Sequence, residues 1–304
     1  MARVMTIRPK PAAEVAIDTS VVRALLQEQH ADLAHLSLIE VGEGWDNTLF
    51  RLGQDLAVRL PRRAASAGLI EHEQRWLPRL SSRLPLPVPT PLRVGRPGSG
   101  FPWSWSVVPW FPGQSALLTP PGDVATTAIA LGRFLRALHH PAPEDAPRNP
   151  WRGVPLAARA ETVQEYLQQL DGLVDRGAVM GLWERVLSTP AWPGPPLWIH
   201  GDLHPGNLLV SGGRLSAVID FGDLAAGDPA TDLSVMWMFL PPSARHTFVA
   251  SAREALDPLD DHTLIRARGW ALALGLAYLA HSGDSDAMSA LGRATIDNAL
   301  SDNP

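Results

Sequence analysis

The sequence predicts an α+β protein with two lobes, and three observations support that prediction. Strand-like apolar runs separated by turn residues dominate the first third of the chain, which indicates a lobe built on an antiparallel sheet. Farther along, apolar residues recur at helical spacing, which indicates a mainly helical lobe. With 304 residues and 45% apolar content, the chain can bury a large core. We place the two lobes at residues 1–109 and 110–304.

The expected elements of the N-terminal lobe are separated by turn signals. Gly42 and Gly44 divide the first two strands, and Pro112-Gly113 follows the last strand, because glycine and proline favour turns. The expected elements are a helix capped by Thr19 or Ser20 and ending at Gln29, strands over residues 36–41, 48–52, 55–60 and 103–111, and a helix that includes residues 69–80.

One acidic residue of the second expected helix is predicted to point inward. Glu73 lies at helical spacing among the apolar residues that run from Leu69 to Leu80. A carboxylate among apolar groups needs a cation, and Arg59, on the strand before this helix, is the candidate partner of Glu73. Glu71 is the alternative choice for the acidic member of the pair.

The C-terminal lobe is expected to consist mostly of helices. Apolar residues recur three and four positions apart in four segments, and the proline-rich segment 141–155 is expected to be a loop between two of them. The four expected helices cover residues 123–139, 156–170, 232–240 and 264–280.

A predicted hairpin in the C-terminal half carries the most specific chemical signal. Two β-rich runs, residues 208–210 and 215–219, flank a Ser-Gly-Gly-Arg turn. Asn207 precedes the first strand and Asp220 follows the second, so their oxygen atoms are expected side by side at one end of the hairpin. Amide and carboxylate oxygens suit Mg²⁺, which needs few protein ligands when nucleotide phosphates supply others. The pattern predicts a site for one or two magnesium ions.

Asp202 lies five residues before Asn207 and is the candidate base. Its carboxylate would accept the proton of an attacking hydroxyl and orient that oxygen toward the γ-phosphorus. The order H-x-D-x-x-x-x-N followed by Asp-Phe-Gly is typical of the catalytic half of a kinase, so phosphoryl transfer is indicated. A zinc site formed by His200, Asp202 and His204 is the alternative, but it leaves the spacing of Asn207 and Asp220 unexplained.

The same tract resembles the Brenner-type catalytic segment of the aminoglycoside phosphotransferase family, which comprises antibiotic and small-molecule kinases built on the protein-kinase fold. His-Gly-Asp at residues 200–202 stands where protein kinases have His-Arg-Asp, and Gly-Asp-Pro at residues 227–229 matches a motif of the family. The match covers about thirty residues. It implies a bilobal, protein-kinase-like fold.

The resemblance implies roles for individual residues of this tract. Asp202 corresponds to the catalytic base, and Asn207 and Asp220 correspond to the magnesium ligands. Asp228 is implied to support the catalytic loop, whereas His200 is expected from its place in the tract to have a structural role, packing against the loop or bonding its backbone. For Asp228, a cap on the following helix is an equally good interpretation.

The resemblance further implies that the N-terminal lobe binds ATP or GTP. Gly42 and Gly44 would lie over the phosphates, although a plain hairpin turn explains them as well. Arg59 stands where protein kinases carry a phosphate-pairing lysine, and an exposed strand arginine is the alternative interpretation. The nucleotide base is expected against backbone groups near Val108 and Trp110.

The acceptor is expected to be a small molecule with a hydroxyl group. Residues 200–232 include five acids and a single base, Arg214, which favours an amine-bearing acceptor over an anionic one. Asp223, Glu161 and Tyr166 are candidate contacts, each with an ordinary surface or packing role as the alternative. An aminoglycoside or macrolide is the leading acceptor class; a kinase of amino alcohols, sugars or homoserine and a non-catalytic nucleotide-binding module are the alternatives.

Composition limits the remaining possibilities. The formal net charge is −5 and there is no basic block, so nucleic acid and anionic membranes are not expected partners. The chain has no cysteine, which excludes disulfides and thiolate chemistry. Its start lacks an apolar run of signal-peptide length, and the apolar stretch 270–280 is too short to span a bilayer. We therefore expect a cytoplasmic location.

Overall fold

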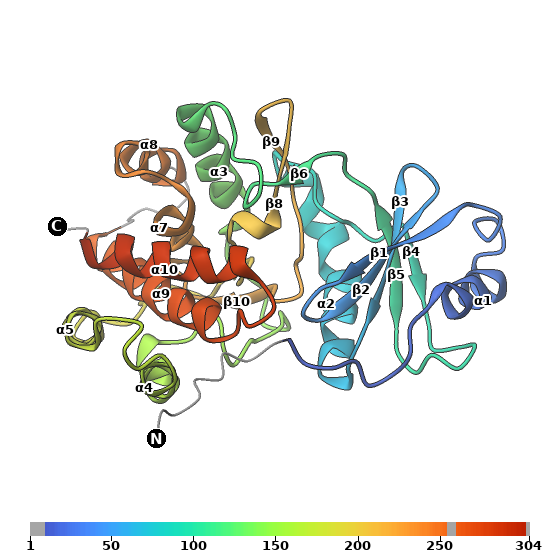
Figure 1. Ribbon diagram of the computed structural model, residues 1–304. Helices are drawn as coiled ribbons and strands as arrows, with labels where there is room; N and C mark the ends of the chain where they lie inside the picture. Colours follow the sequence, from blue (N-terminus) through green and yellow to red (C-terminus); the bar gives the residue numbers. More distant parts are fainter. Residues whose placement is uncertain (1–9, 254–259, 302–304) are drawn as a thin grey trace, which may run out of the picture.

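An antiparallel sheet of five strands forms the N-terminal lobe, as the sequence predicts (Figure 1). The computed structural model of the protein describes residues 10–253 and 260–301, so most of the segment inspected above for a signal peptide lies outside the described residues. The strand order is β1-β2-β3-β5-β4, and the three-residue strand β4 was not expected. The strands are β1 Leu38–Glu43, β2 Asn47–Leu52, β3 Leu56–Pro61, β4 Arg93–Gly95 and β5 Trp105–Pro109.

Helix α1, Thr19–Gln29, packs its buried aliphatic side chains against β2, β3 and β5. The residue that caps this helix is Asp18 and not, as predicted, Thr19 or Ser20. The Asp18 carboxylate accepts hydrogen bonds from the N–H groups of Ser20 and Val21 at 2.8 and 3.0 Å. Asp18 has extended backbone angles, and a carboxylate in that position reaches the first free N–H groups of the helix.

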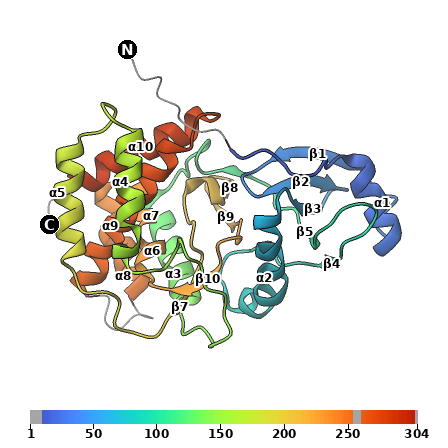
Figure 2. The same ribbon diagram turned by 90° about the horizontal axis from the view of Figure 1, so that it is seen from below.

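Helix α2, Ala64–Leu80, lies between the sheet and the helical lobe, as both views show (Figures 1 and 2). Its Trp76 packs against Trp198 of the C-terminal lobe, with ring centroids 5.0 Å apart. Glu73 is buried on the same helix, as its place in the apolar pattern predicts. The helix therefore connects the two lobes through apolar packing and presents one carboxylate to the interior.

The outer strand β1 contains an irregularity. Its pairing with β2 shifts between Glu40 and Gly42, and Gly42 has a φ of 149°, which glycine adopts without strain. A bulge of this kind bends and twists the strand that contains it. Lys10 Nζ donates a hydrogen bond to the carbonyl oxygen of Glu43 at 3.0 Å, so a charged side chain covers part of the open edge.

The predicted hairpin lies at the boundary between the lobes (Figures 1 and 2). Gly212 and Gly213 form its turn with φ values of 56° and 74°, and this left-handed backbone explains the glycine pair. The strand that pairs with the hairpin begins five residues after β5 ends; the division of the lobes between residues 109 and 110 stays a proposal. The short strands are β6 Gln114–Ser115, β7 Leu197–Ile199, β8 Leu208–Ser211, β9 Arg214–Val218 and β10 Ala225–Gly227, with β6 pairing β8, β8 pairing β9, and β7 pairing β10.

Helices make up most of the C-terminal lobe, as expected. The segment 156–170 begins with a 3-10 turn, Leu156–Arg159, and the segment 232–240 is divided into two short helices at Ser234. Three helices, α5, α8 and α10, were not expected. The helices are α3 Val124–Leu138, α4 Ala160–Gln169, α5 Arg176–Leu187, α6 Ala230–Leu233, α7 Val235–Phe239, α8 Pro242–Arg253, α9 Asp261–Ala280 and α10 Asp286–Ser301.

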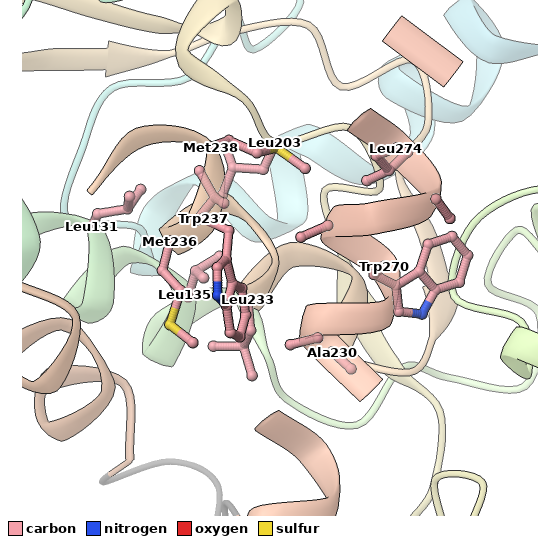
Figure 3. Close-up of a cluster of buried hydrophobic side chains, with 14 of the residues drawn as sticks. Leu131, Leu135, Leu203, Ala230, Leu233, Met236, Trp237, Met238, Trp270 and Leu274 are labelled. Atoms are coloured by element: carbon pink, nitrogen blue, oxygen red, sulfur yellow. The ribbon is translucent and has the colours of Figure 1, made fainter. Parts of the chain in front are cut away.

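Helix α9 lies at the centre of this lobe and is buried along most of its length. Figure 3 shows its Trp270 and Leu274 in one apolar cluster with residues of α6 and α7, among them Leu233 and Trp237. A helix that is apolar on all sides is stable only inside a core, which agrees with this position. Within residues 10–253 and 260–301, no helix combines the length and the apolar character that crossing a membrane would require.

Candidate active site

The loop after β7 carries the candidate base. Gly201 has a φ of 88°, and a Cβ atom at this position would lie 2.4 Å from the carbonyl oxygen of Asp223. Glycine is therefore required twice, by the backbone angle and by the close approach. His200 Nε2 donates to the carbonyl oxygen of Ile219 at 3.0 Å, and its Nδ1 accepts from the N–H of Asp202 at 3.3 Å. Both ring nitrogens of His200 are used to shape the loop.

The two contacts of His200 also bear on the zinc alternative. A ring whose two nitrogens are bonded to backbone groups has no lone pair left for a metal ion. Nδ1 of His204 likewise accepts a hydrogen bond, from the N–H of Gly206 at 3.0 Å. Within the ranges that the structure describes, no three His, Cys, Asp or Glu side chains are grouped so that they could hold a metal ion.

Asp232 supports the catalytic loop. Its fully buried carboxylate accepts hydrogen bonds from the N–H groups of His200 and Gly201 at 2.8 and 2.9 Å. His139 Nε2 lies 3.0 Å from the same carboxylate. The resemblance had implied this supporting role for Asp228, which contacts other groups.

Asp228 belongs to a separate buried ion pair. Its carboxylate accepts from Arg266 Nε at 2.7 Å and from the N–H of Ala230, the first residue of α6, at 3.0 Å. Asp228 therefore bonds to the first residue of the following helix and to Arg266, while Pro229 occupies the cap position of that helix. Asp228 and Asp232 are four residues apart, so the sequence pattern alone does not show which of them contacts the loop.

Asn207 and Asp220 lie at one end of the hairpin, as predicted. The N–H of Ile219 donates to the carbonyl oxygen of Asn207 at 2.9 Å and joins the two ends. Asn207 Nδ2 donates to the backbone oxygen of Asp202 at 2.9 Å, which leaves its Oδ1 as the free acceptor. Asp220 has a φ of 62° and a side chain that is 54% exposed. An amide oxygen and an accessible carboxylate fit the oxygen ligands that Mg²⁺ prefers.

Arg59 joins the two lobes electrostatically. Its guanidinium forms the expected ion pair with Glu73, and its Nη2 lies 3.0 Å from Asp220 Oδ1. Burial raises the pKa of Glu73 to about 7, although the charge of Arg59 opposes that rise. Glu71, the alternative partner, accepts a hydrogen bond from Ser104 instead. The strand, the helix and the hairpin therefore meet at one guanidinium.

Asp202 is surrounded by three side chains, and sequence reasoning connected only His204 with it, as part of the zinc alternative. The hydroxyl of Tyr278 donates to Asp202 Oδ1 at 2.9 Å, and Arg152 Nη2 lies 3.3 Å from the same oxygen. His204 Nε2 lies 3.5 Å from Oδ2. Burial would raise the pKa of Asp202, but the contacts with His204, Arg152 and Tyr278 outweigh it and hold the pKa below its ordinary value of 3.8. The carboxylate of Asp202 is thus ionised and fixed in orientation.

Asp223 lies on the other side of Arg152. Its Oδ2 is 3.6 Å from Arg152 Nε, and its Oδ1 accepts from Asn149 Nδ2 at 2.6 Å. Burial raises the pKa of Asp223, and the charge of Arg152 only partly offsets that effect. Arg152 therefore stands between two carboxylates.

A cavity of about 830 Å³ opens between the lobes beside these groups. Of the residues predicted to contact an acceptor, Asp223 and Tyr166 line it, whereas Glu161 is exposed on α4 and is not part of the wall. Glu161 lies in the first turn of α4 with its side chain exposed to solvent, and it therefore does not reach the cavity. The lining residues used below are Gly44, Trp45, Asp46, Arg148, Trp151, Arg152, Tyr166, Asp202, Asp220, Asp223, Tyr278, His281 and Asp284.

The predicted nucleotide residues lie in different surroundings. Gly44 lines the cavity, whereas Gly42 belongs to the bulge of β1. Val108 is buried within β5, where it pairs with Ala57 of β3. The N–H of Trp110 donates to the carbonyl oxygen of Asp55 at 2.7 Å, so this donor is already used and is not free for a nucleotide base.

The fold and this site define a class of protein: a kinase-like phosphotransferase with an antiparallel-sheet lobe and a helical lobe. The model described as the phosphotransferase enzyme family matches residues 37–268, which is more than half of the chain. The protein therefore belongs to that family.

Solved structures of similar fold include several antibiotic phosphotransferases. The GDP complex of aminoglycoside 2'-phosphotransferase-IIIa has a TM-score of 0.70 at 19% identity, covering 93% of this chain and 99% of that one. Macrolide 2'-phosphotransferase MphH from Brachybacterium faecium, as the apoenzyme, has a TM-score of 0.61 at 23% identity, covering 91% and 98%. The streptomycin-ATP-APH(2")-IIa ternary complex has a TM-score of 0.58 at 17% identity, covering 87% and 91%.

A sequence relative is the uncharacterized protein YcbJ of Bacillus subtilis (strain 168). It is 38% identical over 71 residues, which are 20% of this chain and 23% of that protein. The chain thus matches less than a quarter of the length of this relative.

Proposed function

We propose that this protein transfers the γ-phosphoryl group of ATP or GTP to a hydroxyl group of a small molecule. The observation that carries the proposal is the grouping of Asp202, Asn207 and Asp220. Asn207 is bonded to the backbone of Asp202 and to the N–H of Ile219, the residue before Asp220. Base and ligand candidates therefore belong to one rigid unit at the cavity, and rigid placement is what phosphoryl transfer requires of a protein.

In this proposal the residues divide the work. Asp202 accepts the proton of the acceptor hydroxyl and orients its oxygen, because its carboxylate is ionised and held by Tyr278. Asn207 and Asp220 hold Mg²⁺, which when bound neutralises charge on the phosphates. Arg59, which lies on β3 and is oriented by its ion pair with Glu73, donates hydrogen bonds to the phosphates.

The proposed donor and acceptor are supported by the ligands of the similar structures. GDP and ATP complexes among the similar structures support a nucleotide donor, with ATP and GTP both as candidates. Similar structures named for kanamycin, streptomycin and macrolide phosphotransfer support an aminoglycoside or macrolide as the first acceptors to test. Metabolite kinase activity is the alternative within the same reaction. We propose a cytoplasmic location, where the nucleotide donor is made, and neither nucleic acid nor membrane as a partner.

Nucleotide turnover with an acceptor panel tests the proposal. Wild type and Asp202→Ala are assayed with ATP and GTP against aminoglycosides, macrolides, amino alcohols and sugars. An acceptor that raises turnover in wild type is expected to lose its effect in Asp202→Ala by about 10²- to 10⁴-fold, with the nucleotide Kd nearly unchanged.

The matched control is Asp171→Ala, which removes an exposed carboxylate that does not line the cavity. It is expected to retain wild-type turnover. Stimulation that persists in Asp202→Ala would overturn the role of Asp202. Nucleotide binding without stimulation by any acceptor would favour the non-catalytic binding module, and absence of nucleotide binding would reject the kinase assignment.

A further inference from the structure

Arg152 occupies the place where an amine of a cationic acceptor would be expected. Its guanidinium lies between Asp202 at 3.3 Å and Asp223 at 3.6 Å, and only 18% of its side chain is exposed. Both carboxylates line the cavity. The acidic residues that would attract an amine are therefore already paired with a cation of the protein itself.

The other acidic side chains of the cavity are paired in the same way. Arg63 Nη2 lies 2.9 Å from Asp46 Oδ1, and Arg59 Nη2 lies 3.0 Å from Asp220 Oδ1. Glu43 is paired with Arg62 at 2.8 Å. Among the lining acids of the described residues, Asp284 alone has no cationic partner, and it is exposed.

An acceptor amine that displaced Arg152 from both Asp202 and Asp223 would leave a largely buried guanidinium without a counter-ion. Arginine stays protonated at every accessible pH, so it cannot become neutral in response. Leaving one partner of a buried pair uncompensated costs more than a new exposed pair returns. The exchange is therefore unfavourable unless Arg152 keeps one of these two carboxylates.

Aromatic rings form much of the remaining wall. Trp45 and Trp151 are 43% and 57% exposed, from the two lobes respectively. The ring of His281 lies between Trp45 and Tyr166, with centroid separations of 5.7 and 5.4 Å. Exposed rings around a cavity favour ligands with flat or apolar ring faces.

We propose that Arg152 determines acceptor specificity by filling the amine position, so that the acceptor is a hydroxylated ring compound with no amine or a single amine. This inference rests on the proposed function of the same cavity. Polyamine-like acceptors are excluded by the internal cation, and the aromatic side chains recognise the rings of the acceptor.

Spermine binding tests the position of Arg152 directly. Spermine has four amines and no hydroxyl, so its binding does not depend on phosphoryl transfer and the outcome is separate from that of the turnover assay. Isothermal titration calorimetry without nucleotide compares wild type, Arg152→Gln and the double variant Arg152→Gln/Asp223→Asn. We expect Arg152→Gln to bind spermine at least about tenfold more tightly than wild type, and the double variant to lose that gain.

Arg148→Gln is the matched control. Arg148 lines the same cavity from the same loop, is exposed, and pairs with no carboxylate in the part of the chain that the structure describes. Its removal changes the charge of the cavity equally, and we expect less than about a twofold change in spermine affinity. Equal gains in both variants, or no gain in folded Arg152→Gln, would overturn the proposal.

Should Arg152→Gln fail to fold, wild type and Asp223→Asn decide the question. Wild-type spermine binding tighter than about 0.1 mM that Asp223→Asn removes would show that an outside amine reaches this carboxylate past Arg152, against the proposal. Wild-type binding weaker than that supports it. In the turnover assay, we expect ring acceptors with one amine or none to stimulate wild type more than aminoglycosides do. The reverse order would overturn the proposal.

Discussion

Asp202 shows how neighbouring side chains set the ionisation of one carboxylate. Hydrogen bonds and charges favour the ionised form more strongly than burial disfavours it, so the pKa in the folded protein lies below 3.8. A depressed pKa contributes stability that is complete above the unfolded value and is lost as pH falls through the folded value. The pH dependence of unfolding can therefore report on the contacts of the base.

We predict that the difference in unfolding free energy between wild type and Asp202→Asn depends on pH. Above about pH 5, wild type should be more stable by about 1–3 kcal/mol, the usual contribution of a hydrogen bond to a charged group. Below 3.8 the difference should shrink, because only wild type has this carboxylate to protonate. Urea unfolding between pH 3 and 7 measures it, with Asp171→Asn as the control for an exposed carboxylate. A difference that stays constant down to pH 3 would contradict the assignment.

Sequence separation explains which site residues were predictable. One hairpin and the loop before it contain Asp202, Asn207 and Asp220. Their positions along the chain therefore predict that they lie close together in the fold. Arg152 and Tyr278 contact Asp202 from 50 and 76 residues away, respectively. Arg152 is one of two arginines within the proline-rich segment 141–155, and Tyr278 lies in an apolar helix. Nothing local marks either residue as part of the site.

At the scale of elements, the catalytic loop depends on a glycine that meets two separate demands. Gly201 combines a φ of 88° with a position where a Cβ atom would lie 2.4 Å from a backbone oxygen. Gly212, in the turn of the hairpin, has a φ of 56° but open space around the added atom. A comparison of the two positions therefore distinguishes the cost of a left-handed backbone, which both share, from the cost of a steric clash, which only Gly201 would have.

We predict that Gly201→Ala is far more damaging than Gly212→Ala. The change at Gly212 should cost about 1 kcal/mol, the usual cost of placing alanine in the left-handed region. The change at Gly201 should cost roughly 3 kcal/mol or more and lower acceptor-stimulated turnover, because the backbone oxygen of Asp223 cannot move aside easily. Urea unfolding and the turnover assay measure both effects. Equal costs in the two variants would show that the loop relaxes around the added atom.

Helices and strands were predicted correctly where the local sequence pattern of apolar and turn residues is strong. The central strands and the hairpin were expected because β-rich runs end at glycine turns. Helix α10 was missed because alanine, serine and glycine dilute its apolar stripe, and α5 contains Gly177 and Gly181 within one helix. These helices are stabilised by packing against α9 and its neighbours, which is information that no single segment contains.

At the scale of the whole molecule, the proposed nucleotide contacts Arg59 and Asp220 come from different lobes. Arg59 comes from β3 of the sheet, and Asp220 follows β9 in the other lobe. A ligand bound at both would hold the lobes together. Binding should therefore stabilise the fold as a unit.

We predict magnesium-dependent thermal stabilisation by nucleotide. A ligand at 100 times its Kd adds about 2.7 kcal/mol to the free energy of unfolding, which is a shift of several degrees in Tm. Scanning calorimetry with ATP or GTP, with and without Mg²⁺, measures it. Asp220→Asn should lose most of the magnesium-dependent part, whereas Asp223→Asn, which removes a nearby carboxylate not proposed as a ligand, should retain it. Stabilisation that is the same with and without Mg²⁺ would remove support for the ligand roles of Asn207 and Asp220.

The bulge in β1 has a consequence for how the molecules behave at high concentration. Ile39 and Val41 are 61% and 49% exposed on β1, which within residues 10–253 and 260–301 has no strand on its outer side. An open strand edge is the usual starting point for strand addition between copies and for fibril growth. The shifted pairing at Gly42 and the hydrogen bond from Lys10 interrupt the row of free backbone groups that a second strand would need. The sheet can therefore display aliphatic side chains at its margin and still remain a poor template for aggregation.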